Sequence, residues 1–228
     1  QAGSGTTVLV TGEAGIGKSR LVRTLVEQLG EEVGAVQTWQ CSAHHTTTSL
    51  YPVIRWLEGM PDIAKDEQAE QELKALDEAL AAEGITPRDA RTSRLRVLES
   101  LLVSGSARHP LVLLVEDLHW ADPTTVELLG RIAKSLPRVP VLCVLTFRRE
   151  FEPPWTPALE LELGPLGPDE VRAMATAASD TALDPEVLEL VDSAADGVPL
   201  FVEEMLKMLE HAGGPNGSVP PTLEGLLT

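Results

Sequence analysis

Apolar residues follow two periods along this chain, and each period predicts one kind of element. Short uninterrupted apolar runs predict buried strands, and apolar residues spaced three or four positions apart predict helices with one buried face. The pattern predicts strands at 6–10, 35–41, 111–116, 139–146 and 159–163. It predicts helices at 20–29, 50–61, 62–83, 91–103, 124–135, 168–178, 184–195 and 199–211. Strands that alternate with helices favour an α/β fold with three layers, in which helices cover both faces of a mainly parallel sheet.

A cluster of glycines and prolines at residues 164–168 follows the last predicted strand, and the elements beyond it are all helical. Such clusters mark loops and domain boundaries. The sequence therefore predicts an α/β core over residues 1–163 and a small helical lid over 164–212. The segment GGPNGSVPP and the apolar stretch after it predict that residues 213–228 form a linker and the start of a truncated further domain.

The composition argues against several classes of protein. The chain has 18 Lys and Arg against 35 Asp and Glu among its 228 residues, which gives a formal net charge of -17. This charge repels a phosphate backbone, so we expect no direct binding of nucleic acid. No apolar run is long enough to cross a bilayer, and no signal peptide opens the chain. The two cysteines, Cys41 and Cys143, lie in different predicted strands, so we expect a cytoplasmic protein with reduced thiols and no membrane contact.

A glycine-rich segment between the first predicted strand and helix carries the clearest chemical signal. It matches G-x-x-x-x-G-K-[ST], the phosphate loop that binds ATP or ADP through inward-facing backbone N–H groups and a helix N-terminus. Lys18 is expected to reach the β- and γ-phosphate oxygens, and the Ser19 hydroxyl to bind Mg²⁺. The residues predicted to bind nucleotide are Gly12, Glu13, Ala14, Gly15, Ile16, Gly17, Lys18, Ser19 and Arg20.

The predicted strand at 111–116 runs into two adjacent carboxylates, Glu116 and Asp117. Unpaired charge at the end of a buried strand is costly, so either solvent and local partners satisfy the pair or a cation lies nearby. In phosphate-loop ATPases the acid that ends a second strand helps to hold Mg²⁺, and the next acid can polarise the attacking water. We therefore predict that Glu116 is the metal acid and Asp117 the water-activating acid.

An arginine follows the next predicted strand, in the segment TFRR. Arg148 should project at the same sheet edge as Lys18 and Asp117, where it could sense the γ-phosphate. Arg149 is the neighbouring candidate, and the alternative is a surface arginine that ends a strand.

The chain resembles the STAND class of signal-transducing ATPases, close to the AAA+ proteins, in four segments: GEAGIGKSRLV, LLVEDLHWADPTTVELL, TFRREFEPPW and ADGVPLFVEEML. The resemblance spans nearly the whole chain. It is nearest to the ATPase module of large bacterial regulators that follow a nucleotide cyclase domain or precede a LuxR-type DNA-binding domain. It assigns the metal acid to Glu116, the water-activating acid to Asp117 and the sensor arginine to Arg148. It also implies that Pro199, in the GxP motif at 197–199, contacts the nucleotide from the lid, whereas the alternative is a proline that only starts a helix.

One feature tempers these assignments. Asp117 stands where fast AAA+ hydrolases have glutamate, and the shorter side chain predicts slow turnover. Cys41, His44 and His45 lie in one loop without a second cluster of ligands, so a structural or polar role is favoured over a metal site. His119 and Trp120 are expected to pack and orient the loop after the acids.

Together these observations predict Mg²⁺-dependent ATP binding and hydrolysis as a regulatory switch within a larger signalling protein. Its partners would be the nucleotide, the flanking domains of the regulator and, through nucleotide-dependent self-association, other copies of the chain. The alternatives are a nucleotide-gated scaffold with little turnover and a phosphotransferase, although no acceptor pocket is evident in the sequence.

Overall fold

The structure is a computed structural model that describes residues 4–30, 33–58, 92–93, 95–100, 102, 110–156, 158–179 and 182–211. Contacts divide the chain into two compact units. Unit 1 comprises Gln1–Thr11 and Leu21–Leu161, and unit 2 comprises Gly12–Arg20 and Glu162–Thr228. Each unit has a hydrophobic core of its own.

Unit 1 is built on a five-stranded sheet with the strand order β2-β3-β4-β1-β5. Neighbouring strands from β2 to β1 pair in parallel, so their carboxyl ends meet at one edge of the sheet. The predicted α/β fold with a parallel sheet is confirmed, and each predicted strand is present. The strand bounds are Thr6–Gly12 (β1), Ala35–Gln40 (β2), Leu111–Glu116 (β3), Val141–Phe147 (β4) and Leu159–Leu163 (β5).

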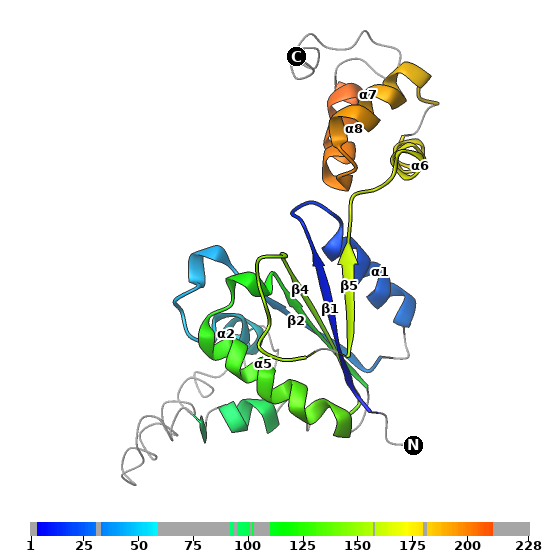
Figure 1. The fold of residues 1–228 in the computed structure, drawn as a ribbon. Helices are drawn as coiled ribbons and strands as arrows, with labels where there is room; N and C mark the ends of the chain where they lie inside the picture. Colours follow the sequence, from blue (N-terminus) through cyan, green and yellow to red (C-terminus); the bar gives the residue numbers. More distant parts are fainter. Residues whose placement is uncertain are drawn as a thin grey trace. The chain divides into compact units, whose positions relative to one another are not determined.

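Helices cover both faces of this sheet. They are α1 (Lys18–Leu29), α2 (Tyr51–Glu58) and α5 (Pro123–Ser135). The chain crosses the sheet in opposite directions from β1 to β2 and from β2 to β3. Right-handed crossovers therefore place α1 on the face opposite α2 and α5, as Figure 1 shows.

The central strand β3 is buried on both sides, as its apolar run predicts. Leu111, Leu113 and Val115 pack in the core with α2 and α5. Val112 and Leu114 are also buried and, because side chains alternate along a strand, they face the opposite layer. The strand ends where the acids begin, since Asp117 is in the left-handed region with φ 56°.

In the described part of residues 162–228, unit 2 has three helices, each with a proline at its first position: α6 (Pro168–Ala178), α7 (Pro185–Ala195) and α8 (Pro199–His211). Proline is favoured there because its fixed φ suits a helix and its missing N–H would have no intrahelical partner. Buried side chains from the three helices, among them Val171, Val191 and Val202, form the core. The helices predicted at 168–178, 184–195 and 199–211 are present.

Other predicted elements agree less closely or are not described. Three 3-10 helices were not predicted: η2 (Ala43–His45), η3 (Leu118–Trp120) and η4 (Leu136–Arg138). The predicted helix 91–103 is helical at each of its described residues, 92–93, 95–100 and 102. The predicted helix 62–83 and the predicted linker and further domain at 213–228 lie outside the described residues.

Candidate nucleotide-binding site

The predicted phosphate loop lies directly between β1 and α1, and α1 begins at Lys18. The first turn of α1 contains no acidic residue, so no carboxylate of that turn offsets the positive end of the helix dipole. Gly17 has φ +101°, and a Cβ added there would meet no atom within 4 Å. The loop thus has open space beside Gly17, which leaves room for a ligand close to its backbone.

Lys18 is held by the carbonyl groups of its own loop. Its Nζ donates to Gly12 O and to Glu13 O, both at 2.8 Å, and the residue is buried. Ser19 and Arg20 follow at the exposed start of α1. A phosphate that binds this loop must therefore draw Lys18 away from backbone oxygens or share it with them.

The loop also packs against the first turn of α8, within unit 2. Leu200 N donates to Gly15 O at 3.2 Å. Gly15 has φ +77°, and a Cβ added there would lie 3.0 Å from Leu200 Cβ, so only glycine fits both the backbone and the space. Arg20 Nη1 forms an exposed ion pair with Glu203 Oε1 at 3.0 Å. The contacts at Gly15 and at Arg20 therefore join the loop region to α8. In the sequence they lie on either side of Lys18 and Ser19, the residues predicted to bind phosphate and Mg²⁺.

Pro199 is the first residue of α8, so it does start a helix, as the alternative interpretation of GVP expects. The preceding turn is fixed by two backbone hydrogen bonds, from Val198 N to Ala195 O and from Leu166 N to Gly197 O, both at 2.8 Å. The second bond ties the motif to the glycine- and proline-rich segment at 164–168. The contact between Pro199 and a nucleotide stays a prediction.

The acid pair lies in unit 1, at the carboxyl edge of the sheet. Asp117 N donates to Thr146 Oγ1 at 3.2 Å, and Asp117 Oδ2 accepts from Gln40 Nε2 at 3.0 Å. Glu116 is half-buried, and its carbonyl accepts from Cys41 N at 3.0 Å. Residues at the ends of β2 and β4 thus hold Asp117 in a left-handed conformation that is uncommon outside glycine.

Sequence reasoning missed Gln40 and Thr146 as partners of Asp117. Gln40 is the last residue of β2, and Thr146 is the last but one of β4. A polar residue near the end of each strand beside the acid-bearing strand was the available signal, because parallel strand ends meet at one edge.

The segment after the acids is fixed by a buried carboxylate, Asp122, at the N-cap of α5. It accepts from Thr124 N at 2.9 Å, Thr125 N at 3.1 Å and Leu50 N at 3.0 Å. Leu118 of η3 is buried in the core, and the His119 and Trp120 rings lie 4.9 Å apart. Asp122, the last residue of the segment HWAD, therefore has a structural role that does not depend on catalysis.

Arg148 directly follows β4, so it lies at the same edge as Asp117. Its carbonyl accepts from Phe151 N at 3.1 Å, and the Phe147 and Phe151 rings meet edge to face at 5.6 Å, which fixes the turn. The Arg148 side chain is half-buried and that of Arg149 is exposed. This position suits the predicted sensor, but the role stays a prediction.

The loop with Cys41 and the two histidines shows no metal-binding arrangement. Among the described residues no group of three or more His, Cys, Asp or Glu side chains could hold a metal ion. The His45 ring stacks on Tyr51 at 3.8 Å. Burial raises the pKa of the Cys41 thiol from 9.0 to about 12, with smaller effects from Asp117 and Asp122, and burial alone raises that of Cys143 to about 12. Such thiols are protonated and unreactive at neutral pH.

Comparison with known proteins identifies the family. A family model described as an AAA ATPase domain matches residues 1–145. The chain belongs to the AAA ATPase domain family. This AAA ATPase domain is 30% identical, over 242 residues, to an uncharacterized protein of Rhizobium meliloti (strain 1021). The match covers 92% of the chain and 23% of that relative, so the domain spans less than a quarter of the relative's length.

Solved structures share the fold of this AAA ATPase domain at low sequence identity. A point variant of RuvB from Thermotoga maritima is 13% identical with a TM-score of 0.60, over 97% of this chain and 61% of the RuvB chain. A chain of Drosophila ORC bound to DNA is 16% identical with a TM-score of 0.58, over 99% and 55% of the two chains. At such identities the similarity shows the fold alone.

These findings confirm the predicted AAA+-related P-loop ATPase, and the family supports nucleotide binding and hydrolysis. The narrower STAND class rests on the sequence motifs. None of the helices among the described residues is long and apolar enough to span a membrane. The cytoplasmic location stays a prediction.

Proposed function

We propose that this AAA ATPase domain binds ATP with Mg²⁺, hydrolyses it slowly, and uses the nucleotide state to set the position of its helical lid. Binding falls to the phosphate loop, Gly12 to Arg20, with Lys18 on the β- and γ-phosphates. Mg²⁺, when bound, would neutralise charge on the phosphates, and Ser19 and Glu116 are its proposed protein ligands. The open space beside Gly17 and the absence of acidic residues from the first turn of α1 fit this role.

Hydrolysis falls to the acid pair and the arginine at the strand ends. Asp117 would accept a hydrogen bond from the attacking water and take its proton, while Gln40 and Thr146 hold the acid in place. Arg148 would stabilise negative charge on the γ-phosphate. The chain itself joins the loop to the end of β1, and the parallel register brings the ends of β3 and β4 to the same edge.

The observation that carries the switch is the hydrogen bond from Leu200 N to Gly15 O. It joins the middle of the phosphate loop to the first turn of α8, next to Pro199. If the loop rearranges around phosphate, either this hydrogen bond breaks or the first turn of α8 moves with the loop. In both cases the change at the loop alters the surroundings of α8. The hinge is proposed at Gly164 to Pro168, a segment in which Leu166 N donates a hydrogen bond to Gly197 O.

One observation favours the scaffold as a second candidate. The Gln40 amide already occupies one lone pair of Asp117, whose side chain is a methylene shorter than glutamate. Such a domain could hold nucleotide as a structural switch and scarcely turn it over. The motifs further suggest a STAND-type regulator with flanking domains and nucleotide-dependent self-association.

Single-turnover hydrolysis separates the two candidates. Excess protein is mixed with radiolabelled ATP and Mg²⁺, and ADP is followed over time. We expect ADP to form and to require Mg²⁺ and Asp117. Bound ATP that stays intact while chelation of Mg²⁺ still weakens binding would favour the scaffold.

A further inference from the structure

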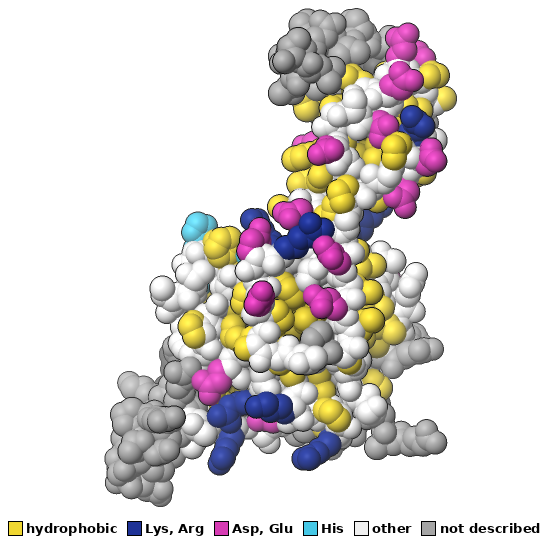
Figure 2. Space-filling view, in the orientation of Figure 1, with side chains coloured by type: hydrophobic (Ala, Val, Ile, Leu, Met, Phe, Trp, Pro, Cys, Tyr) yellow, Lys and Arg dark blue, Asp and Glu magenta, His cyan; other side chains and the backbone are white. Residues whose placement is uncertain are grey.

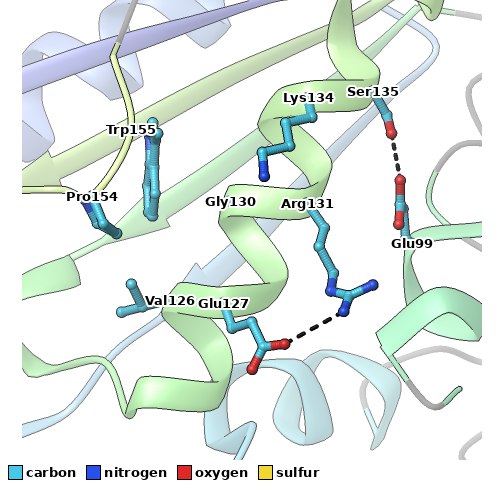
Figure 3. Close-up of a pocket in the computed structure, with 9 residues that line it drawn as sticks. All are labelled: Glu99, Val126, Glu127, Gly130, Arg131, Lys134, Ser135, Pro154 and Trp155. Carbon is cyan, nitrogen blue, oxygen red and sulfur yellow. Dashed lines mark hydrogen bonds and ion pairs between the residues drawn. The ribbon is translucent and has the colours of Figure 1, made fainter. Parts of the chain in front are cut away.

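A groove that none of the nucleotide-binding residues lines runs beside α5 in unit 1 (Figure 3). Its volume is about 530 Å³, enough for one or two side chains of a ligand. One face of α5 forms a wall, and Glu99 and the segment with Pro154 and Trp155 form the others. The groove therefore brings together three stretches that are far apart in the sequence.

The groove has an apolar surface next to Gly130. A Cβ added at Gly130 would lie 3.5 Å from Trp155 Cε3, so the indole lies close to the helix at the one position without a side chain. Val126 and Pro154 continue this surface. An apolar side chain of a ligand can cover the flat indole and gain the free energy of burial.

Among the described residues, one cation of the groove has no counter-ion. Arg131 pairs with Glu127 at 3.5 Å, and the Ser135 hydroxyl donates to Glu99. Lys134 is exposed and makes no hydrogen bond or ion pair with any described residue. An anionic group is thus expected beside Lys134 and not beside the two glutamates.

A row of basic residues that includes Lys134 runs along α5 and η4 of this acidic protein. Arg131, Lys134 and Arg138 recur three and four residues apart along α5 and η4, which places them on one side. Lys and Arg side chains gather over α5 in Figure 2, although the whole chain has a net charge of -17. This patch is able to attract a ligand of opposite charge.

We propose that the groove binds a short peptide segment of a partner protein, in which an apolar side chain stands next to a carboxylate. The apolar side chain lies on Trp155 and Val126, and the carboxylate pairs with Lys134. A nucleic acid fits less well, because its continuous phosphate chain would pass Glu99 and Glu127. A peptide presents its charge at one point and avoids them.

Fluorescence anisotropy with three fluorescein-labelled peptides tests this proposal. The first peptide, GSELLDSG, has both features. GSKLLKSG reverses its charge, and GSESSDSG removes its apolar side chains. We expect GSELLDSG to bind about tenfold more tightly than either control peptide. Equal binding of all three, or of none, would overturn the proposal.

Variants locate the binding. Lys134→Glu should weaken GSELLDSG about tenfold, whereas Lys134→Arg should keep its affinity. Lys207→Glu, a charge reversal at an exposed lysine of α8, is the matched control and should have no effect. Trp155→Ala should also weaken binding, and if that variant does not fold, the surface variants at Lys134 decide. Unchanged affinity in Lys134→Glu, or Lys134-dependent binding of a short DNA duplex in place of the peptide, would refute the peptide site.

Discussion

The acid end of β3 and the phosphate loop carry the two halves of the proposed chemistry, and the protein holds them in different ways. Asp117 is fixed by side chains from two other strands, Gln40 and Thr146. The Lys18 ammonium donates hydrogen bonds to carbonyl groups of its own loop. The same loop is hydrogen-bonded to α8 through Gly15 and Leu200. The acid is thus held in place before nucleotide binds, whereas the lysine must leave its backbone partners or share them with phosphate.

This difference explains where a conformational signal can start. A preorganised acid needs little reorganisation during the reaction, which favours catalysis. Because its conformation stays the same, it cannot transmit the nucleotide state to another element. A loop that exchanges its own oxygens for phosphate oxygens has two arrangements. Because Leu200 is bonded to that loop, α8 is the element able to follow the exchange.

The largest expected effect comes from removing the cation of the loop. Lys18→Ala should weaken ATP binding about 100-fold or more, because charged hydrogen bonds to phosphate are lost. Isothermal titration calorimetry with Mg-ATP measures this. Lys207→Ala removes an exposed lysine of α8 and serves as the control. Equal ATP affinity in Lys18→Ala and the parent would show that phosphate does not bind at this loop.

A change at the acid end should instead separate hydrolysis from binding. Asp117→Asn should lower kcat about 100-fold and leave ATP affinity unchanged, because the water loses its base while an amide oxygen can still accept from Gln40. Phosphate release and nucleotide titration measure the two quantities. Asp169→Asn, at a carboxylate 99% exposed, is the matched control. Normal turnover in Asp117→Asn would mean that another group activates water.

The buried thiols give an effect of intermediate size on stability. The pKa of Cys41 rises from 9.0 to about 12 on folding, by burial first and by Asp117 and Asp122 next. The folded state therefore keeps its proton where the unfolded state has lost it. Stability is fully present below pH 9 and falls as pH rises from 9 towards 12, by up to about 1.4 kcal/mol per pH unit.

Urea unfolding of the parent, Cys41→Ala and Cys143→Ala, measured at about pH 8 and about pH 10, tests this slope. Each alanine variant should lose less stability between the two pH values than the parent. Asp117→Asn should also make the decline of stability with pH shallower, because it removes a charge that raises the pKa of Cys41. It should leave the contribution of Cys143 unchanged, because burial alone raises the pKa of that thiol. The same decline in parent and both alanine variants would rule out a contribution from the thiols.

The smallest expected effect lies at the exposed pair between Arg20 and Glu203, whose side chains are 69% and 40% exposed. Such pairs contribute about 0.5 kcal/mol and are screened by salt. Arg20→Glu and Glu203→Arg should each weaken the contact between loop and lid, and the double variant should restore it. A double-mutant cycle on thermal stability at low and high salt measures the coupling. A coupling that high salt does not reduce would point to an effect other than the ion pair.

Much of this fold follows from local sequence patterns. β3 is an inner strand of the sheet and is buried on both faces, and its uninterrupted apolar run predicts this burial. The phosphate loop was found because its chemistry requires fixed residue types at fixed spacing. The turn at Asp117 and η3 was not found, since a left-handed aspartate leaves no periodic signal.

Contacts between distant residues could not be predicted in the same way. The bonds from Gln40 to Asp117 and from Leu200 to Gly15 join residues far apart in the chain, and each depends on how whole elements meet. The grouping of the phosphate loop with the α6–α8 helices likewise joins residues far apart in the chain, because contacts and not chain order decide it.

Hydrogen exchange with and without Mg-ATP tests whether the phosphate loop signals to the lid. The measurement compares amides at 12–20, in the loop, with amides at 197–204, in the GVP turn and the start of α8. We predict that Mg-ATP slows exchange in both stretches of the parent protein and in neither stretch of Lys18→Ala. Protection at 12–20 with none at 197–204 would contradict the switch, because α8 would then take no part in nucleotide binding.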